Sequence, residues 1–188
     1  MAAPRLEDLT TIEAAVWREL EAAVSGRGHP WKLGVLATRD GEEADARSVV
    51  LREIDSAARE LLIYTDARSP KALQIAAHPQ GTLVLWSREL GWQLRLKLVL
   101  SMATSGLAVT SRWARLRLTP AAQDYLSPLP PGSTLEQPLP LASIQKESRD
   151  RFAVITAGVQ LVDWLELDAR GHRRAVFEAG RPGRWVSP

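Results

Sequence analysis

The chain has 188 residues, of which 45% are hydrophobic and seven are tryptophan, so it is long enough to bury one sizeable core. With 24 basic and 22 acidic residues the net charge is only +2, which gives no sign of the strongly basic character typical of nucleic-acid-binding proteins. The lack of cysteine excludes a disulfide framework and a thiolate metal site, and three scattered histidines argue against a protein-bound zinc ion.

The N-terminal stretch does not resemble a targeting signal. It reads MAAPRLEDLTTIEAAVW, in which acidic residues interrupt the apolar core that a signal peptide requires, and no apolar run of 18 residues occurs in the chain. We therefore expect a soluble, unprocessed, cytoplasmic protein with no membrane partner, and the lack of cysteine is compatible with that location.

The first predicted element is an amphipathic helix over about residues 9–24. Its apolar positions recur at steps of three and four, at Leu9, Ile12, Val16, Leu20 and Ala23. Thr10 and Glu13 have the spacing of a capping box, which predicts that the helix starts near Thr10. The run of residues 25–30 contains two glycines and a proline, and it ends the helix.

Strand patterns follow as far as residue 100. Residues 31–38 and 46–53 are predicted strands joined by the hairpin-like turn 39–42. A run rich in valine, leucine and isoleucine at residues 48–51 lies within the predicted strand 46–53. Similar runs predict strands at residues 61–65 and 82–86, and an alternating run predicts another at 93–100.

One predicted helix interrupts these strands. Ser69 is placed to cap it, Pro70 suits its first position, and His78 followed by proline ends it. Arg68 and Lys71 lie at its start, where free main-chain N–H groups and the positive end of the helix dipole favour a phosphate. The strand, loop and helix start therefore predict an anion site.

The C-terminal half is less regular. Residues 99–107 are mildly strand-like, whereas 111–118, with three arginines, fit a helix or a strand equally well. Residues 119–140 hold six of the twelve prolines and predict an extended surface loop that is ordered by packing on a partner. A short polar helix is expected near residues 143–151. Strands are then expected at 152–155, 159–167, 173–178 and 184–186, with a turn at 168–171.

These elements predict a mainly β fold, a small closed or partly closed β-barrel with peripheral helices. A parallel α/β sheet needs a crossover for each strand pair, and residues 33–100 offer one helix among five strands. The expected organisation is a single domain over residues 1–188, with the N-terminal helix at about 9–24, a barrel core at about 31–107, the proline-rich loop at about 119–140 and C-terminal strands at about 152–187.

Five short motifs occur in order: RSVVLR at residues 47–52, YTDARSPK at 64–71, HP at 78–79, LVLW at 83–86 and WQLRL at 92–96. Their order and spacing resemble the pyridoxamine 5'-phosphate oxidase family, the FMN-binding split β-barrels. The tail motifs VDWLEL, GHRRAVF and RWVSP resemble the branch called oxidase-related. The resemblance implies a homodimer that holds two FMN molecules at the subunit interface, acts on a small-molecule substrate or electron donor, and binds no nucleic acid.

The resemblance also implies cofactor-binding residues. Arg47 and Lys71 would contact the FMN phosphate, Ser69 would lie beside it, residues 64–65 would add main-chain and hydroxyl contacts, and Gln93 would face the flavin ring. An ammonium, a guanidinium and a hydroxyl suit a phosphate dianion, and a neutral amide suits the ring edge. The full implied set is Arg47, Val49, Val50, Leu51, Arg52, Tyr64, Thr65, Arg68, Ser69, Lys71 and Gln93.

The chain also departs from the family pattern. Pro70 stands where the vitamin-oxidising members usually have an arginine, and Arg68 is the candidate to replace that missing phosphate ligand. Arg47 and Arg52 are an odd number of residues apart, so a regular strand would place them on opposite faces and keep them from binding the same group. Residues 172–174 lack the spacing that reads the substrate phosphate in the vitamin enzymes, which predicts little oxidation of pyridoxamine phosphate.

The sequence therefore predicts an FMN-dependent oxidoreductase of unknown substrate, in which the protein binds and orients the flavin and excludes water. One alternative is a flavin-binding carrier or sensor without turnover. Another, nucleic-acid binding through the arginines of residues 112–117 and the C-terminal tail, requires these arginines on one face. Taken singly, Arg47 and Lys71 are also typical of a solvated strand end, and it is the spacing of the whole set that favours a site.

Overall fold

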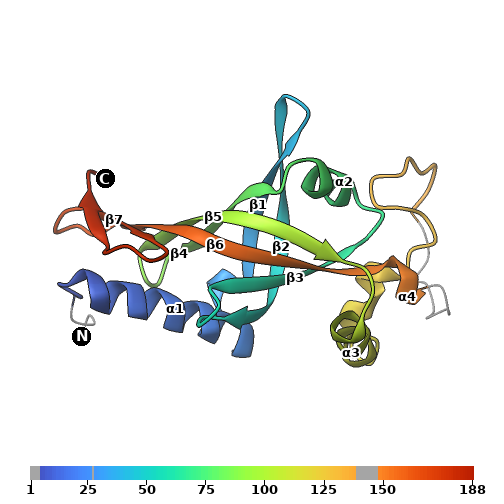
Figure 1. The fold of residues 1–188 in the computed structure, drawn as a ribbon, viewed down its shortest axis with the longest axis horizontal. Coiled ribbons are helices and arrows are strands. Elements are labelled where there is room, and N and C mark those ends of the chain that lie inside the picture. Colours follow the sequence, from blue (N-terminus) through green and yellow to red (C-terminus); the bar gives the residue numbers. More distant parts are fainter. Residues whose placement is uncertain (1–4, 27, 139–147) are drawn as a thin grey trace.

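Antiparallel strands form the centre of the molecule, and helices lie around them (Figure 1). The computed structural model describes residues 5–26, 28–138 and 148–188. Its elements, in chain order, are α1 (Leu9–Ser25), η1 (Pro30–Lys32), β1 (Leu33–Asp40), β2 (Glu43–Asp55), β3 (Glu60–Asp66), α2 (Pro70–Ala77), β4 (Gln80–Ser87), β5 (Trp92–Ala103), α3 (Leu107–Leu116), η2 (Pro120–Tyr125), α4 (Ser148–Arg151), β6 (Phe152–Glu166), β7 (Arg173–Glu178) and β8 (Arg184–Val186).

The strands close into a barrel. Hydrogen bonds link them in the order β3-β2-β1-β4-β5-β6, and β6 pairs back with β3, so that six strands of the described chain form an antiparallel ring. β7 and β8 extend the sheet beyond this ring. The predicted mainly β barrel with peripheral helices is confirmed.

β6 was expected as two strands and is one of 15 residues. Its first half, as far as Gly158, pairs with β3, and its second half, from Leu161, pairs with β7. The small residues Ala157 and Gly158 resemble a strand break in the sequence, but they mark the place where the strand changes neighbours. This change of partner lets one strand both close the barrel and carry the C-terminal extension (Figure 1).

α1 confirms the predicted N-terminal helix. Its buried face includes Ile12, Val16 and Leu20, which belong to the apolar stripe of the sequence. The predicted start at a Thr10 capping box is wrong, because the N-cap is Asp8, whose Oδ1 accepts a hydrogen bond of 2.8 Å from the Thr11 N–H.

The segment after β5 is helical where the sequence left a choice. Residues 107–116 form α3, whose Val109, Trp113 and Leu116 are buried. Of the predicted polar helix at 143–151, residues 148–151 form α4, and 143–147 lie outside the described residues. Residues 139–140 of the expected proline-rich loop lie outside them as well. The part of the loop nearest α3 contains the 3-10 helix η2.

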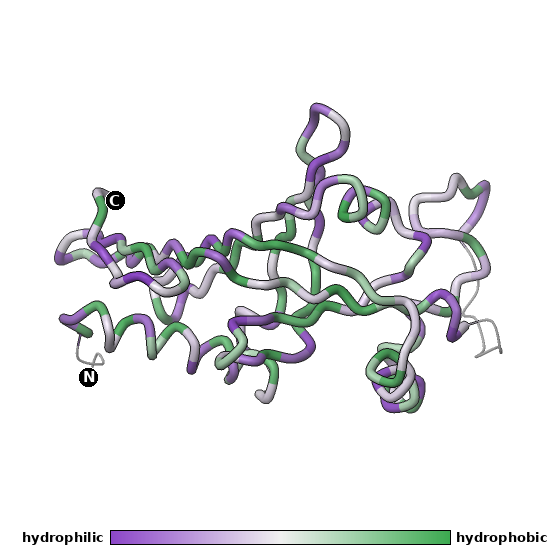
Figure 2. Tube along the Cα trace, viewed as in Figure 1, coloured by the Kyte–Doolittle hydropathy of each residue, from purple (hydrophilic) through white to green (hydrophobic). Residues whose placement is uncertain are grey.

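The buried residues form two clusters. The larger fills the barrel and the side covered by α1, and it contains the rings of Trp31, Trp92 and Trp164. The smaller lies beneath α3 and η2, around Phe152 and Trp113. Figure 2 shows the matching pattern, with hydrophobic residues along the central strands and hydrophilic residues at the tip of the β1–β2 hairpin.

No helix among the described residues is long and apolar enough to cross a membrane. The same part of the chain contains no group of three or more histidine, aspartate or glutamate side chains arranged to hold a metal ion.

Candidate functional site

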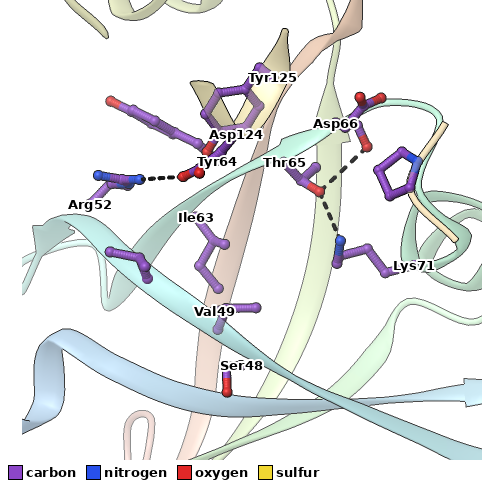
Figure 3. Close-up of a pocket in the computed structure, with 12 residues that line it drawn as sticks. Ser48, Val49, Arg52, Ile63, Tyr64, Thr65, Asp66, Lys71, Asp124 and Tyr125 are labelled. Carbon is purple, nitrogen blue, oxygen red and sulfur yellow. Dashed lines mark hydrogen bonds and ion pairs between the residues drawn. The ribbon is translucent and has the colours of Figure 1, made fainter. Parts of the chain in front are cut away.

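A pocket of about 200 Å³ opens between β2, β3, the start of α2 and η2. Its two ends differ in chemistry, with Lys71 and Thr65 at one end and Arg52, Asp124 and Tyr125 at the other (Figure 3). The residues that line it are Ser48, Val49, Val50 and Arg52 of β2, Ile63, Tyr64, Thr65 and Asp66 of β3, Lys71 of α2, Asp124 and Tyr125 of η2, and Pro131.

The Lys71 end is built as an anion site from side chains. Lys71 Nζ donates to Thr65 Oγ1 at 3.1 Å, and the Ser69 hydroxyl lies 3.3 Å from the same oxygen. Burial lowers the pKa of Lys71, and the nearby Arg47 lowers it further. No carboxylate of the described chain lies within 4 Å of Lys71 Nζ, so this half-buried ammonium has no ion-pair partner. A phosphate at this point would supply the missing charge.

The main chain contributes less to this anion site than the sequence predicted. Pro70 has no N–H, and the N–H groups of Ser69 and Ala72 already donate to the carbonyls of Asp66 and Ser69. Ser69 is the N-cap residue of α2, as expected, but its side chain makes no capping hydrogen bond, because its hydroxyl turns toward Thr65.

Arg47 lies behind the Lys71 end and outside the pocket wall. Its guanidinium contacts Thr38 and Asp45 and donates to Gln74 Oε1 at 2.8 Å. Gln74, on the buried face of α2, also donates to Asp45, and this bond is the main cause of the lowered pKa of that carboxyl. The predicted contact of Arg47 with a phosphate stays a prediction. The polar network that holds Arg47 was not visible in the sequence.

At the other end, Arg52 has an unsatisfied donor. Arg52 lies at a β-bulge between Leu51 and Glu53 and lines the pocket with Ser48 and Val50, the alternate residues of β2, whereas Arg47 does not, as strand parity predicted. The Arg52 guanidinium lies over the Tyr64 ring and 3.9 Å from Asp124, while its Nε is buried without a hydrogen-bond partner. A buried N–H that lacks a partner is costly, and this one is covered by protein atoms, so it is not offered to a ligand in the pocket.

Tyr64 is fixed by residues that the sequence did not single out. Its hydroxyl donates to Glu53 at 2.7 Å, and Arg112 of α3 binds both oxygens of the same carboxylate at 2.7 and 2.9 Å. Burial, and then Glu53, raise the pKa of Tyr64, so its hydroxyl stays protonated. The guanidinium of Arg112 is engaged in this way, whereas the side chain of Arg115 is 73% exposed, and the nucleic-acid alternative stays a hypothesis.

Arg68 makes its contacts away from the anion site. It binds both carboxylate oxygens of the buried Asp66, and its guanidinium also donates to main-chain carbonyls of residues 127–129. In this structure Arg68 is therefore directed away from the anion site, and its role as a replacement for the phosphate ligand lost at Pro70 stays a prediction. Its charge is neutralised, and its donors are occupied.

Some of the remaining predicted residues line the pocket, and others do not. Val49, Val50, Tyr64 and Thr65 line the pocket. Leu51 is completely buried in the barrel core. Gln93 lies at the start of β5, opposite Trp86 and Leu165, and does not line the pocket of its own chain. The roles of Leu51 and Gln93 toward a cofactor stay predictions.

Comparisons with known proteins point to one family. The family described as "Pyridoxamine 5'-phosphate oxidase, FMN-binding domain" matches residues 14–103, a range that includes β2, β3 and α2. A pyridoxine/pyridoxamine 5'-phosphate oxidase of Caulobacter vibrioides is 27% identical over 183 residues, which are 92% of this chain and 80% of the relative. Residues 14–103 are thus similar to the pyridoxamine 5'-phosphate oxidase-like FMN-binding domain family.

Other relatives of this family match in sequence or in fold. An oxidase of the same name from Thermosynechococcus vestitus is 43% identical over 58 residues, so that the match spans 31% of this chain and only 26% of that relative. A pyridoxamine 5'-phosphate oxidase-related, FMN binding protein from Nostoc punctiforme has the same fold, with a TM-score of 0.70 and 18% identity over 98% of this chain and 100% of the other. PhzG from Burkholderia lata, in complex with tetrahydrophenazine-1-carboxylic acid, has a TM-score of 0.68 and 17% identity over 98% and 94%.

The residues of the pocket fit part of an FMN molecule. Lys71, Thr65 and Ser69 form a donor set for a phosphate, and the guanidinium of Arg52 lies at the opposite end of the pocket. Between them lie apolar side chains, Val49 and Ile63. The volume of about 200 Å³ is below the roughly 300–1,000 Å³ of typical ligand sites, so one chain encloses only part of a flavin.

Proposed function

We propose that this protein is an FMN-dependent oxidoreductase whose pocket between β2, β3 and α2 holds the cofactor. The observation that carries the proposal is the position of Lys71. It is a half-buried cation without a carboxylate partner among the described residues, grouped with the hydroxyls of Thr65 and Ser69 at the start of a helix. A dianionic phosphate satisfies such a group, and an uncharged ligand does not.

Bound FMN would supply the redox chemistry by accepting a hydride or electrons at its ring. The chain would bind and orient it. Lys71 holds positive charge at the phosphate end, and Val49 and Ile63 exclude water along the pocket. Arg52 places its positive charge at the other end of the pocket. Tyr64 keeps its proton and stays hydrogen-bonded to Glu53. It therefore forms a fixed part of the pocket wall and does not act as a base.

Titration with flavins tests the proposal. FMN should bind near one per subunit and FAD poorly, because the Lys71 end closes around a terminal phosphate. Anaerobic mixing of the yellow protein with NADH, NADPH or an amine then separates an oxidoreductase from the second candidate, a flavin carrier or sensor. Bleaching of the flavin absorbance on a catalytic timescale supports turnover, and a flavin that binds and is never reduced supports the carrier. Failure to bind FMN contradicts both.

We predict that the protein is a homodimer with FMN at the subunit interface. β1 and β4 carry exposed apolar side chains on the outer face of the barrel, including Leu33 at 54% and Trp86 at 45% exposure. This face adjoins the pocket, since Leu33 and Val35 pair with Val50 and Ser48 of the pocket wall. A second copy packed there would bury the apolar face and complete the undersized pocket.

Light scattering at micromolar concentration measures the assembly. A mass of about twice that of the chain is the expected result. Replacing Trp86 with glutamate places a charge in the apolar interface, so it should shift the protein toward monomer and weaken FMN binding at the same time. A monomeric wild-type protein that binds FMN with full affinity would contradict the shared site.

We predict little or no oxidation of pyridoxamine phosphate by the FMN-loaded protein. A substrate phosphate needs a second set of free cations, and the arginines of the tail are engaged. Arg173 binds Glu166, and its guanidinium lies over the rings of Trp164 and Trp185. Arg174 binds both oxygens of Asp163.

Oxygen uptake with pyridoxamine phosphate on flavin-saturated protein checks this prediction. A buried phosphate without paired donors costs several kcal/mol, which removes useful affinity at metabolite concentrations. Turnover of about one per second with micromolar saturation would contradict it and would show that Arg173 or Arg174 reaches the substrate.

A further inference from the structure

The tripeptide Asp-Ala-Arg occurs three times, at residues 45–47, 66–68 and 168–170. In each copy the arginine pairs with the aspartate two residues earlier. The copies at 66–68 and 168–170 have the same local geometry. In both copies the main-chain N–H of the arginine donates to Oδ1 of the aspartate at 2.8 Å. The guanidinium binds the two carboxylate oxygens at 3.0 and 2.7 Å in the copy at 66–68 and at 2.9 and 2.7 Å in the copy at 168–170.

The two copies differ in the contacts that the guanidinium makes beyond the aspartate. Arg68 also donates to the carbonyls of Ser127, Pro128 and Leu129, at 2.9, 3.0 and 3.4 Å. Its side chain is 27% exposed, whereas that of Arg170 is 61% exposed and makes no contact in the described chain beyond its own turn. Local sequence therefore explains the aspartate pairing, and only the position of Arg68 in the fold explains its contacts with residues 127–129.

A second guanidinium holds the same segment. Arg151, where α4 meets β6, donates to the carbonyls of Leu126 and Ser127 at 2.8 and 2.9 Å. The two arginines are tied to each other through the main chain, because the Ala67 N–H donates to the Arg151 carbonyl at 2.6 Å. Four successive carbonyls, of residues 126–129, thus accept hydrogen bonds from two arginines.

The segment needs such external donors. Residues 126–131 contain three prolines, which lack N–H groups and cannot join a regular hydrogen-bond ladder. Residues 126–131 also connect the residues that form one wall of the pocket. Asp124 and Tyr125 precede the clamped carbonyls, Pro131 follows them, and all three line the pocket. Figure 3 shows Asp124 and Tyr125 on the side of the pocket near Arg52.

We propose that Arg68 is a positioning residue which, together with Arg151, clamps residues 126–129 against the barrel and so holds Asp124, Tyr125 and Pro131 in place as one wall of the flavin pocket. The clamp explains why the arginine beside the anion site is not directed toward a phosphate. Its relevance to a flavin rests on the proposed function, and the clamp itself does not.

Chymotrypsin tests the clamp on the protein as purified, with or without flavin. Tyr125 and Leu126 are 4% and 2% exposed, so cleavage after either requires the segment to open. We expect Arg68→Gln to raise the rate of cleavage at these two bonds at least tenfold and Arg68→Lys to raise it less. Arg170→Gln removes the same local pairing and should leave the rate within twofold of wild type. Cleavage after Tyr64 in β3, resolved by mass spectrometry, reports global unfolding and should not rise in proportion.

The FMN-loaded protein gives the readout that a merely structural role would not change. Arg68→Gln should bind FMN within about threefold of wild type, since Arg68 does not line the pocket. It should nevertheless alter the visible circular dichroism of the flavin and at least double the iodide quenching constant of its fluorescence.

Two results would overturn the proposal. One is an unchanged ratio of cleavage at Tyr125 and Leu126 to cleavage at Tyr64. The other is a tenfold or greater loss of FMN affinity with the segment still protected, which would make Arg68 a phosphate ligand. If Arg68→Gln does not fold, Arg68→Lys against Arg170→Lys gives the same comparison. If FMN does not bind at all, the proposed function fails while the cleavage ratios still decide the clamp.

Discussion

Replacement of Lys71 with alanine is expected to weaken FMN binding by about 1.5–3 kcal/mol, roughly ten- to 150-fold in dissociation constant. The ammonium is half-buried, and among residues 5–26, 28–138 and 148–188 it has no carboxylate partner and one hydrogen bond, to the neutral hydroxyl of Thr65. A phosphate therefore gains a charge-assisted contact that no acidic residue competes for. Titration of the apoprotein with FMN, followed by flavin fluorescence, measures the change.

The chain offers a matched control. Lys97 on β5 donates to Thr82 Oγ1 at 3.1 Å, the same type of contact at the same length, but on the exposed outer face. Lys97→Ala should leave FMN affinity within about twofold of wild type. Lys71→Arg keeps the charge and should recover part of the loss. A Lys71→Ala titration that matches wild type would remove Lys71 from the cofactor site.

Replacement of Phe152 with alanine is expected to lower the free energy of unfolding by about 3–5 kcal/mol. Phe152 is fully buried and is the centre of an aromatic group, with its ring centroid 5.0 Å from that of Tyr64, 5.5 Å from Trp113 and 5.4 Å from Tyr125. The lost ring leaves a cavity that β3, α3 and η2 cannot close together, because each is also hydrogen-bonded elsewhere.

Urea unfolding followed by tryptophan fluorescence measures this loss. Phe152→Leu fills much of the same space and should cost clearly less than the alanine variant. Leu107→Ala, at a position that is 86% exposed on α3, should change stability by under about 0.5 kcal/mol. A loss below 1 kcal/mol for Phe152→Ala would show that the smaller cluster does not depend on this ring. Since Tyr64 and Tyr125 also line the pocket, FMN affinity should fall together with stability.

Much of the fold could be predicted because its determinants are local. The spacing of Ile12, Val16 and Leu20 specifies α1, and Pro70 with His78 delimits α2. These signals act within one or two turns of chain, so they survive without knowledge of the neighbours. The motif from Tyr64 to Lys71 brings a strand end, a serine and a lysine together for the same reason.

The exceptions arise where partners are distant in sequence. Gly158 resembles a break, yet β6 continues through it, because β3 and β7 offer hydrogen bonds on either side of that point. Arg52 lies at a bulge against β3, which a strand pattern cannot reveal.

The three Asp-Ala-Arg copies show this division most directly. By itself the sequence determined that each arginine pairs with the aspartate two residues earlier, and that Lys71 follows Ser69 at a helix start. Only the tertiary structure decided what each guanidinium does with its remaining donors. Arg47 meets Gln74, Arg68 meets the carbonyls of residues 127–129, and Arg170 faces solvent. The physical reason is that a guanidinium has five N–H donors and one carboxylate uses only some of them, so the others go to whichever acceptors the fold places within reach.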